Sequence, residues 1–94
     1  MESDHFALVE NPFFEWELSR LGGVAELDEI LMPVMWAIAR MADSFPFAPE
    51  SKSIRVATWK PVLTIQGDLI RLLVYFTILD LETVELISIK SEPC

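Results

Sequence analysis

Cysteine and histidine each occur once in this chain of 94 residues, as Cys94 and His5. A single thiol cannot form a disulfide within the chain, which excludes a disulfide-stabilised fold and fits a reducing compartment. Motifs of the form Cys-x-x-Cys or His-x-x-x-His and glycine-rich phosphate loops are absent as well. We interpret His5 and Cys94 as exposed residues of the two termini, and we expect neither a metal nor a cofactor.

Long hydrophobic runs are also missing. The apolar run at residues 72–78 is interrupted by Thr77, whereas a helix that spans a membrane needs ~20 apolar residues. The N-terminal residues 1–5 are acidic, whereas a signal peptide begins with basic residues and continues with apolar ones. These absences predict a soluble, cytoplasmic protein that does not contact a membrane.

Positive charge is scarce and unevenly placed. The chain has a net charge of -8, and residues 1–50 hold ten acids but only two basic residues, whereas residues 51–94 hold five of each. This balance argues against binding nucleic acid by overall electrostatics, although a local basic strip in the second half remains open. A hydrophobic content of 52% excludes a disordered acidic tail. We expect one globular domain over residues 1–94.

The first half is predicted to begin with a short strand and a helix. Residues 6–9 form an apolar run that is typical of a strand. Asn11 followed by Pro12 is typical of a helix start, with asparagine as the N-cap and proline in the first turn. We expect this helix to end at Gly22 and Gly23, where a left-handed C-cap causes no steric strain.

A second helix is expected over residues 24–43, because apolar residues recur there at spacings of three and four. The stripe consists of Leu27, Ile30, Leu31, Val34, Met35, Ile38 and Met41. Pro33 lies inside this helix and predicts a kink or a break, since proline lacks the N–H donor and its ring clashes with the preceding turn. The acidic residues Glu26, Asp28 and Glu29 are explained by the helix N-terminus and are not expected to bind a metal.

The second half has the period of two that is typical of strands. Residues 44–53 are interpreted as the connection to it. Strands are predicted at 54–59, 69–79 and 83–89, with a turn at 66–68. Residues 62–65 either continue the strand before them or pair separately. A change of phase between Leu86 and Ile87 predicts a β-bulge.

These elements predict an α+β fold. It begins with a short N-terminal strand and a helical hairpin, and an antiparallel three-stranded meander follows, because short turns require antiparallel neighbours. Both helices are expected to pack on one face of the sheet. We expect the stripe of the second helix to lie against Ile70, Leu72, Val74, Phe76 and Ile78.

Two groups of residues are candidates for function. The first is a basic set interleaved with aromatic residues on the strands, comprising Arg55, Trp59, Lys60, Arg71, Tyr75 and Lys90. Arg71 and Tyr75 are four apart on one strand, so they share a face at a distance of ~13 Å. Such a face could hold phosphates and stack bases. The alternative is a solvated face whose aromatic residues cover apolar surface.

The second group lies on the side of the second helix that is opposite the apolar stripe. Met32, Pro33 and Trp36 form an apolar ridge there, beside Glu29 and Arg40. An exposed ridge of this kind is typical of a contact with a partner, which would be a second copy in a homodimer or the helix of another protein. The alternative is that the first helix covers the ridge.

The order of elements and several local strings resemble the RelE/ParE toxin superfamily, whose members have a short first strand, a helical hairpin and an antiparallel meander. The strings are HFALV at 5–9, PFF at 12–14, SIRV at 53–56, LIRLLVY at 69–75 and VELISI at 84–89. The resemblance covers nearly the whole chain. It implies the toxin of a toxin–antitoxin pair, with an antitoxin peptide as partner.

The resemblance also implies candidate catalytic residues. RelE-like members cleave messenger RNA in the ribosomal A site with basic side chains and a tyrosine, so Arg55, Arg71 and Tyr75 are the candidates here. In the family the tyrosine follows the central arginine by three residues, a position that Val74 occupies in this chain. The chain is also acidic where active nucleases are basic, and Glu92 stands where a cation would be useful in the C-terminal stretch.

Three functions follow from these observations. The first is a toxin-fold protein that acts mainly by contact with an antitoxin or a target, without robust nuclease activity. The second is a ribosome-dependent messenger RNA endonuclease that uses Arg55 and Arg71. The third is a small-molecule-binding or dimerisation module of similar layout. We rank protein contact first because the charge and the position of the tyrosine disfavour the nuclease.

Overall fold

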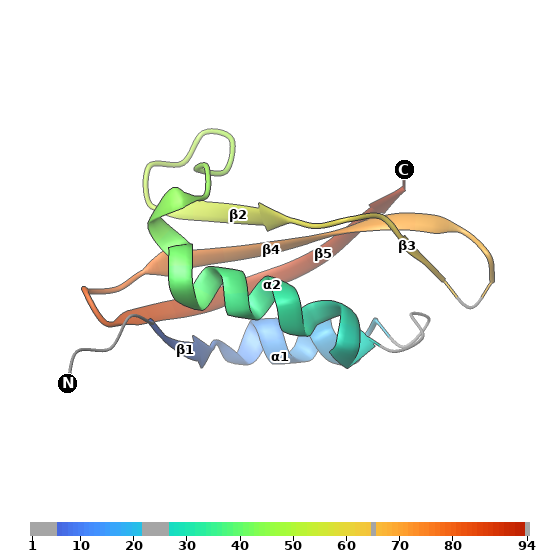
Figure 1. Cartoon of the computed structure of the whole chain (residues 1–94), viewed down its shortest axis with the longest axis horizontal. Helices are drawn as coiled ribbons and strands as arrows, with labels where there is room; N and C mark the ends of the chain where they lie inside the picture. Colours follow the sequence, from blue (N-terminus) through green and yellow to red (C-terminus); the bar gives the residue numbers. More distant parts are fainter. Residues whose placement is uncertain (1–5, 22–26, 65, 94) are drawn as a thin grey trace.

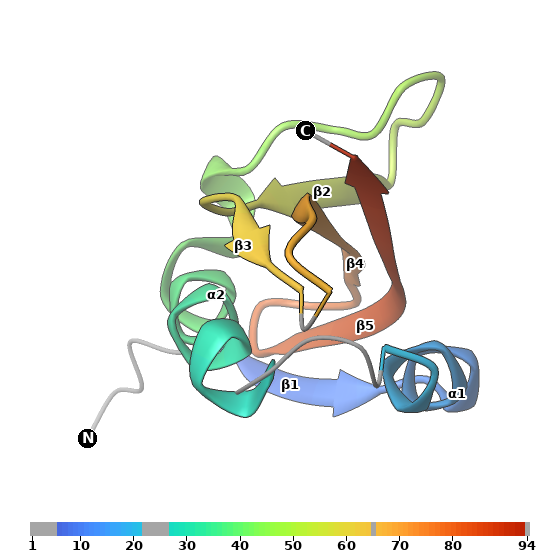
Figure 2. The same cartoon turned by 90° about the vertical axis from the view of Figure 1, so that its right-hand side faces the viewer.

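A computed structural model describes residues 6–21, 27–64 and 66–93, and it shows an α+β fold with two helices on one side of a mixed five-stranded sheet (Figure 1, Figure 2). The helices are α1 (Pro12–Ser19) and α2 (Leu27–Met41), followed by a short 3-10 turn at Ala42–Ser44. The strands are β1 (Ala7–Glu10), β2 (Ile54–Thr58), β3 (Val62–Leu63), β4 (Leu69–Ile78) and β5 (Thr83–Pro93). None of the helices in the described ranges is long and apolar enough to cross a membrane.

The sheet has the strand order β1-β5-β4-β2, with β1 parallel to β5 and the other pairs antiparallel. The segment after Pro61 pairs separately with β4, through Val62 opposite Ile70 and Leu63 opposite Leu69. Because β5 occupies one edge of β4, the strands β2 and β3 both pair with the other edge of β4. Residues 59–61 between them interrupt this pairing. Proline cannot donate to a strand ladder, which explains the gap. The sheet curves around α2 (Figure 2).

The start of α1 is as predicted, but its end is not. Asn11 is the N-cap, and its Oδ1 accepts a hydrogen bond of 2.8 Å from the Phe13 N–H. The helix ends at Ser19, earlier than expected, because the next two N–H groups bond to carbonyls three residues back, at Glu17 and Leu18. Such tighter bonds close a helix. The predicted glycine cap at residues 22–23 lies outside the described residues.

The helix α2 continues through Pro33, so the predicted break does not occur. Proline has no N–H, so the carbonyl four residues before Pro33 loses its helical hydrogen bond. Pro33 is exposed, and this carbonyl therefore lies on the side of the helix that faces water. On the opposite side of the helix, Leu31 before Pro33 and Val34 after it are both buried in the core. The predicted start at residues 24–26 lies outside the described residues.

The hydrophobic core lies between α2 and β4, as the sequence predicted. From α2, the buried side chains are Leu31, Val34 and Ile38, and from the neighbouring strands they are Ala57, Leu72, Val74, Phe76, Val84, Leu86 and Ile89. Phe14 joins this core from α1, and Ile30, Met35, Ile70 and Ile78 pack at its margin. Met41 was expected in the stripe but is 45% exposed, because the chain turns there and buries Ala42 instead.

The predicted bulge in β5 is confirmed. Tyr75 is paired with Ser88 and Phe76 with Leu86, so Ile87 is an extra residue in β5. The extra residue shifts the alternation by one position, and Leu86 and Ile89 can therefore both face the core although they are three apart. The strand also runs to Pro93, four residues beyond its predicted end.

Candidate functional site

Arg55 lies on the side of the sheet that faces the core, because its partner in the ladder is the fully buried Phe76. Its Nη1 donates a hydrogen bond of 2.6 Å to the carbonyl of Phe45, and its guanidinium lies 4.1 Å from the centre of the Phe47 ring. Both aromatic residues belong to the connection between α2 and β2. The side chain of Arg55 therefore fastens this connection to the sheet.

Arg71 and Tyr75 lie on the other side of the sheet, and they share that face as predicted. Arg71 is paired with Glu92 on β5, with 3.8 Å between Nη1 and Oε1 and with both side chains nearly half exposed. Alternation along the strands places Arg55 and Arg71 on opposite sides.

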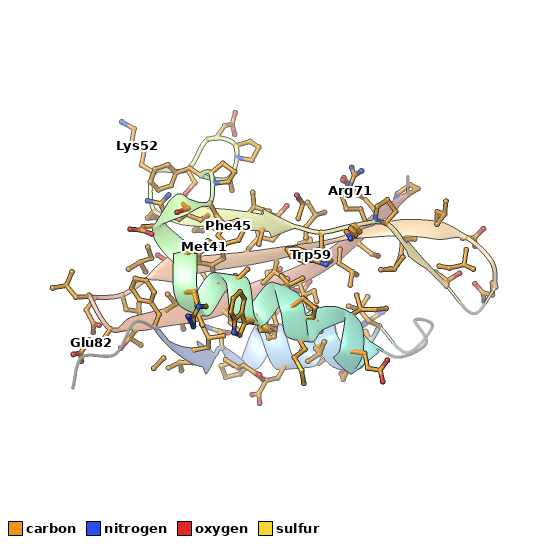
Figure 3. The ribbon with its side chains drawn as sticks, in the orientation of Figure 1. Met41, Phe45, Lys52, Trp59, Arg71 and Glu82 are labelled. Atoms are coloured by element: carbon orange, nitrogen blue, oxygen red, sulfur yellow. The ribbon has the colours of Figure 1, made fainter. Side chains whose placement is uncertain are left out.

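The structure does bring Arg71 together with two other members of the basic set. A shallow hollow of about 430 Å³ is lined by Thr58, Trp59, Lys60, Arg71 and Glu92, and Figure 3 labels Trp59 and Arg71 near the gap between β2 and β3. Two cations against one carboxylate make this hollow a site where an anion can bind. Lysine and arginine side chains are hydrogen-bond donors without an acceptor, so they can hold a phosphate. Tyr75 is not part of the lining.

Lys90, the remaining member of the basic set, is held by α1. Its Nζ lies 2.7 Å from Oε2 of Glu17 and 5.7 Å from the centre of the Phe13 ring. Glu17 also accepts hydrogen bonds from the Ser88 hydroxyl and from the Ile89 N–H. Burial raises the pKa of Glu17, but the hydrogen bonds and the charge of Lys90 outweigh it, so the pKa is lowered from its ordinary value of 4.5. The sequence held no local sign of this cluster, because its members are about 70 residues apart.

The ridge on α2 is exposed. Met32 is 70% exposed and Trp36 is 58% exposed, Pro33 is exposed beside them, and the Arg40 guanidinium lies 4.6 Å from the centre of the Trp36 ring. Of the two alternatives for this ridge, coverage by α1 is therefore not observed. The chain that the structure describes leaves the ridge open to a partner.

A second exposed aromatic group lies on α1 and was not singled out from the sequence. Phe13 and Trp16 stack at 5.8 Å between ring centres, and the Arg20 guanidinium lies 4.8 Å from the Trp16 ring. Their spacing of three and of four along a helix is the signal that could have found them.

The structure offers little for metal chemistry in the residues that it describes. Within those ranges, no group of three histidine, cysteine, aspartate or glutamate side chains could hold a metal ion. His5, Glu26 and Cys94 lie outside the described residues, as does the side chain of Asp28.

Comparison of the chain with models of protein families, with curated proteins and with solved structures finds no match.

Proposed function

We propose that this protein is a RelE/ParE-like toxin-fold protein of the cytoplasm that acts by contact with another protein, an antitoxin or a cellular target. The observation that carries this proposal is the exposed ridge on α2. A folded domain that keeps Met32 and Trp36 largely in water while the opposite side of the same helix is buried has a surface suited to a partner. Aromatic residues and methionine are enriched in such contacts.

The arrangement of elements supports the proposal. A short first strand, two helices and antiparallel strands follow one another in the order that the resemblance implies. A fold can be inherited without its chemistry, and function therefore depends on the residues at the surface.

The surroundings of the candidate catalytic residues support contact over cleavage. Arg55 is engaged with the connection at Phe45 and Phe47, and Arg71 lies on the far side of the sheet beside an acid. Cleavage of RNA needs groups that take up a proton and stabilise charge at one phosphate. Two arginines on opposite sides of a sheet cannot act on one phosphate.

The ribosome-dependent nuclease remains the second candidate, because the hollow beside Arg71 and Lys60 has a net positive charge and an indole ring. The third candidate, a small-molecule-binding or dimerisation module, gains no support from the hollow beside Arg71, because that hollow is open to solvent.

The first test is cleavage of messenger RNA by purified protein on programmed ribosomes, read by primer extension. We expect little or no cleavage, and the same result for Arg71→Ala. Robust A-site cleavage that Arg71→Ala abolishes and Glu92→Gln retains would establish the nuclease and contradict the proposal.

The second test is growth after induced expression. We expect the wild-type chain to slow growth weakly, Trp36→Glu to remove this effect, and Arg71→Ala to retain it. Met41→Glu is the matched control, since it also places a carboxylate on an exposed apolar position of α2 but away from the ridge. Slowed growth that survives Trp36→Glu would show that the ridge is not the contact surface.

A further inference from the structure

Another hollow lies at the start of β2, where the connection from α2 turns back onto the sheet. Its volume is about 250 Å³, and it is lined by Phe47, Lys52, Ser53, Arg55, Thr77 and Ile78. Of the described residues that line it, two are cations and none is an acid, although the chain has a net charge of -8. The hollow therefore concentrates positive charge and is a candidate site for a negatively charged ligand.

The guanidinium of Arg55 is held in place at this hollow. Its Nη1 donates a hydrogen bond of 2.6 Å to the Phe45 carbonyl, and the group lies 4.1 Å from the centre of the Phe47 ring. A guanidinium has five N–H donors in one plane, and the bond to Phe45 uses one of them. A guanidinium that is already positioned loses little freedom on binding, and its planar geometry matches two oxygens of a phosphate.

A sharp turn in the connection brings Lys52 and Ser53 to the same hollow. Glu50 has a φ of 63°, in the left-handed region that residues other than glycine rarely adopt. The Thr77 hydroxyl then donates a hydrogen bond of 2.8 Å to the Ser53 carbonyl and fixes the end of the connection to β4. Backbone strain persists only where the surrounding structure holds it, and it is frequent at ligand sites.

The charges at this hollow favour a dianion over a monoanion. A phosphate monoester has a charge of about -1.5 to -2 at pH 7, which two cations can balance. Lys52 extends outward from the connection (Figure 3), and its flexible four-carbon side chain can turn toward an anion at the mouth of the hollow. In the hollow beside Arg71, by contrast, Glu92 offsets one of the two cations.

We propose that the hollow at the start of β2 binds a small phosphate monoester, with Arg55 and Lys52 holding the phosphate and Phe47 contacting the rest of the ligand. The Phe47 ring is 46% exposed, so it offers apolar surface beside the two cations. A monoester of an aromatic alcohol is therefore expected to bind more tightly than inorganic phosphate. This inference goes beyond the proposed function, because the surface and the kind of ligand both differ from those of the ridge on α2.

The test is a titration of the isotope-labelled full chain with phenyl phosphate at neutral pH, followed by NMR of the backbone N–H groups. Saturable shifts are expected at Ser53, Arg55 and Thr77. Phenyl sulfate has a similar shape but a single negative charge, and its dissociation constant is expected to be about fivefold higher or more, because charge-assisted hydrogen bonds weaken with the charge. Inorganic phosphate, which lacks the ring, is expected to bind more weakly than phenyl phosphate.

Variants separate the site from the fold. Lys52→Gln removes one cation from an exposed position, and it is expected to raise the dissociation constant for phenyl phosphate about tenfold. Arg55→Lys keeps the charge but loses the planar donors, and it is expected to weaken binding as well. Arg20→Gln is the matched control for Lys52→Gln, since it removes an exposed cation at the end of α1, and it should bind like the wild type. Far-UV circular dichroism confirms that each variant is folded.

Several results would overturn the inference. Absence of a saturable shift excludes the site, and shifts at Lys60 and Arg71 in its place would assign the anion to the other hollow. Unchanged affinity in Lys52→Gln, or equal affinity for phenyl phosphate and phenyl sulfate, would contradict the role of two cations. The growth test with Trp36→Glu does not depend on this hollow, so the proposed function and the phosphate site can fail independently of each other.

Discussion

Glu17 connects two segments that lie about 70 residues apart in the chain. Its carboxylate accepts hydrogen bonds from the Ser88 hydroxyl, the Ile89 N–H and the Lys90 ammonium group. These donors lie on β5 beyond the end of β1, where none of the described strands pairs with that edge. Glu17 thus accepts hydrogen bonds from donors along the edge of β5, which would otherwise need another strand or water as their partner.

Glu17→Gln is expected to lower the free energy of unfolding by about 1–3 kcal/mol near neutral pH, because hydrogen bonds to a charged group are lost. The pKa of Glu17 is lowered in the folded protein, so its stabilisation is present above the ordinary pKa of 4.5 and is lost as the pH falls below it. Urea unfolding from neutral pH down to acid should therefore show a smaller pH dependence in Glu17→Gln than in the wild type. Glu15→Gln, an exposed acid on the same helix, is the control, and an equal change in both variants would contradict the role of Glu17.

Val74 is the central residue of the core face of β4 and is 1% exposed. Val74→Ala is expected to lower the free energy of unfolding by ~1–3 kcal/mol, since burial is lost and a cavity remains. Leu81→Ala removes a larger side chain that is 95% exposed, and it should have almost no effect. Similar losses in the two variants, measured by urea unfolding, would mean that Val74 is not in the core.

At the scale of elements, the connection between α2 and β2 is ordered by the sheet that follows it. The Ala48 N–H bonds to the Ile54 carbonyl at 2.8 Å, and the Val56 N–H bonds to the Pro46 carbonyl at 3.0 Å. Arg55 adds the bond to Phe45 and the contact with Phe47. This connection covers the outer edge of β2 and so protects it from pairing with other chains.

Arg55→Ala is expected to loosen this connection while the core remains folded. The hydrogen bond and the cation–π contact together predict a loss of about 1–2 kcal/mol. Hydrogen exchange at the Ala48 and Val56 N–H groups should become faster. Lys52→Ala is the control, because Lys52 lies in the same connection and points away from the sheet (Figure 3). Unchanged exchange in Arg55→Ala would mean that the backbone bonds alone order the connection.

At the scale of the whole molecule, one core joins both helices to the sheet. Buried residues from α1, α2, β2, β4 and β5 form a single hydrophobic cluster. Cooperative unfolding follows when all elements depend on one core. Trp59 packs against this cluster, whereas Trp16 and Trp36 are more than half exposed, so Trp59 is the tryptophan whose environment changes most on unfolding.

We expect the chain to unfold in one transition. In the variant W16F/W36F, the fluorescence of Trp59 reports on the sheet, while far-UV circular dichroism also reports on the helices. The two signals should give the same midpoint in urea. Different midpoints would contradict the expectation of one domain over residues 1–94.

The elements follow from local physics, and the sequence was sufficient for most of them. The N-cap at Asn11, the apolar stripe from Leu31 to Ile38 and the alternation of β4 each depend on a few neighbouring residues. The bulge at Ile87 could be read from a change of phase for the same reason. Pro33 and the end of α1 were harder to predict, because packing and short-range hydrogen bonds there compete with the preferences of single residues.

The candidate sites needed the tertiary structure. Which side of the sheet Arg55 faces depends on its pairing with Phe76, and the engagement of Lys90 depends on Glu17, far away in the chain. The sequence could place Met32, Pro33 and Trp36 together because one helix turn joins them. Only the packing of α1 could decide that they stay exposed, since coverage is a property of distant segments and not of local spacing.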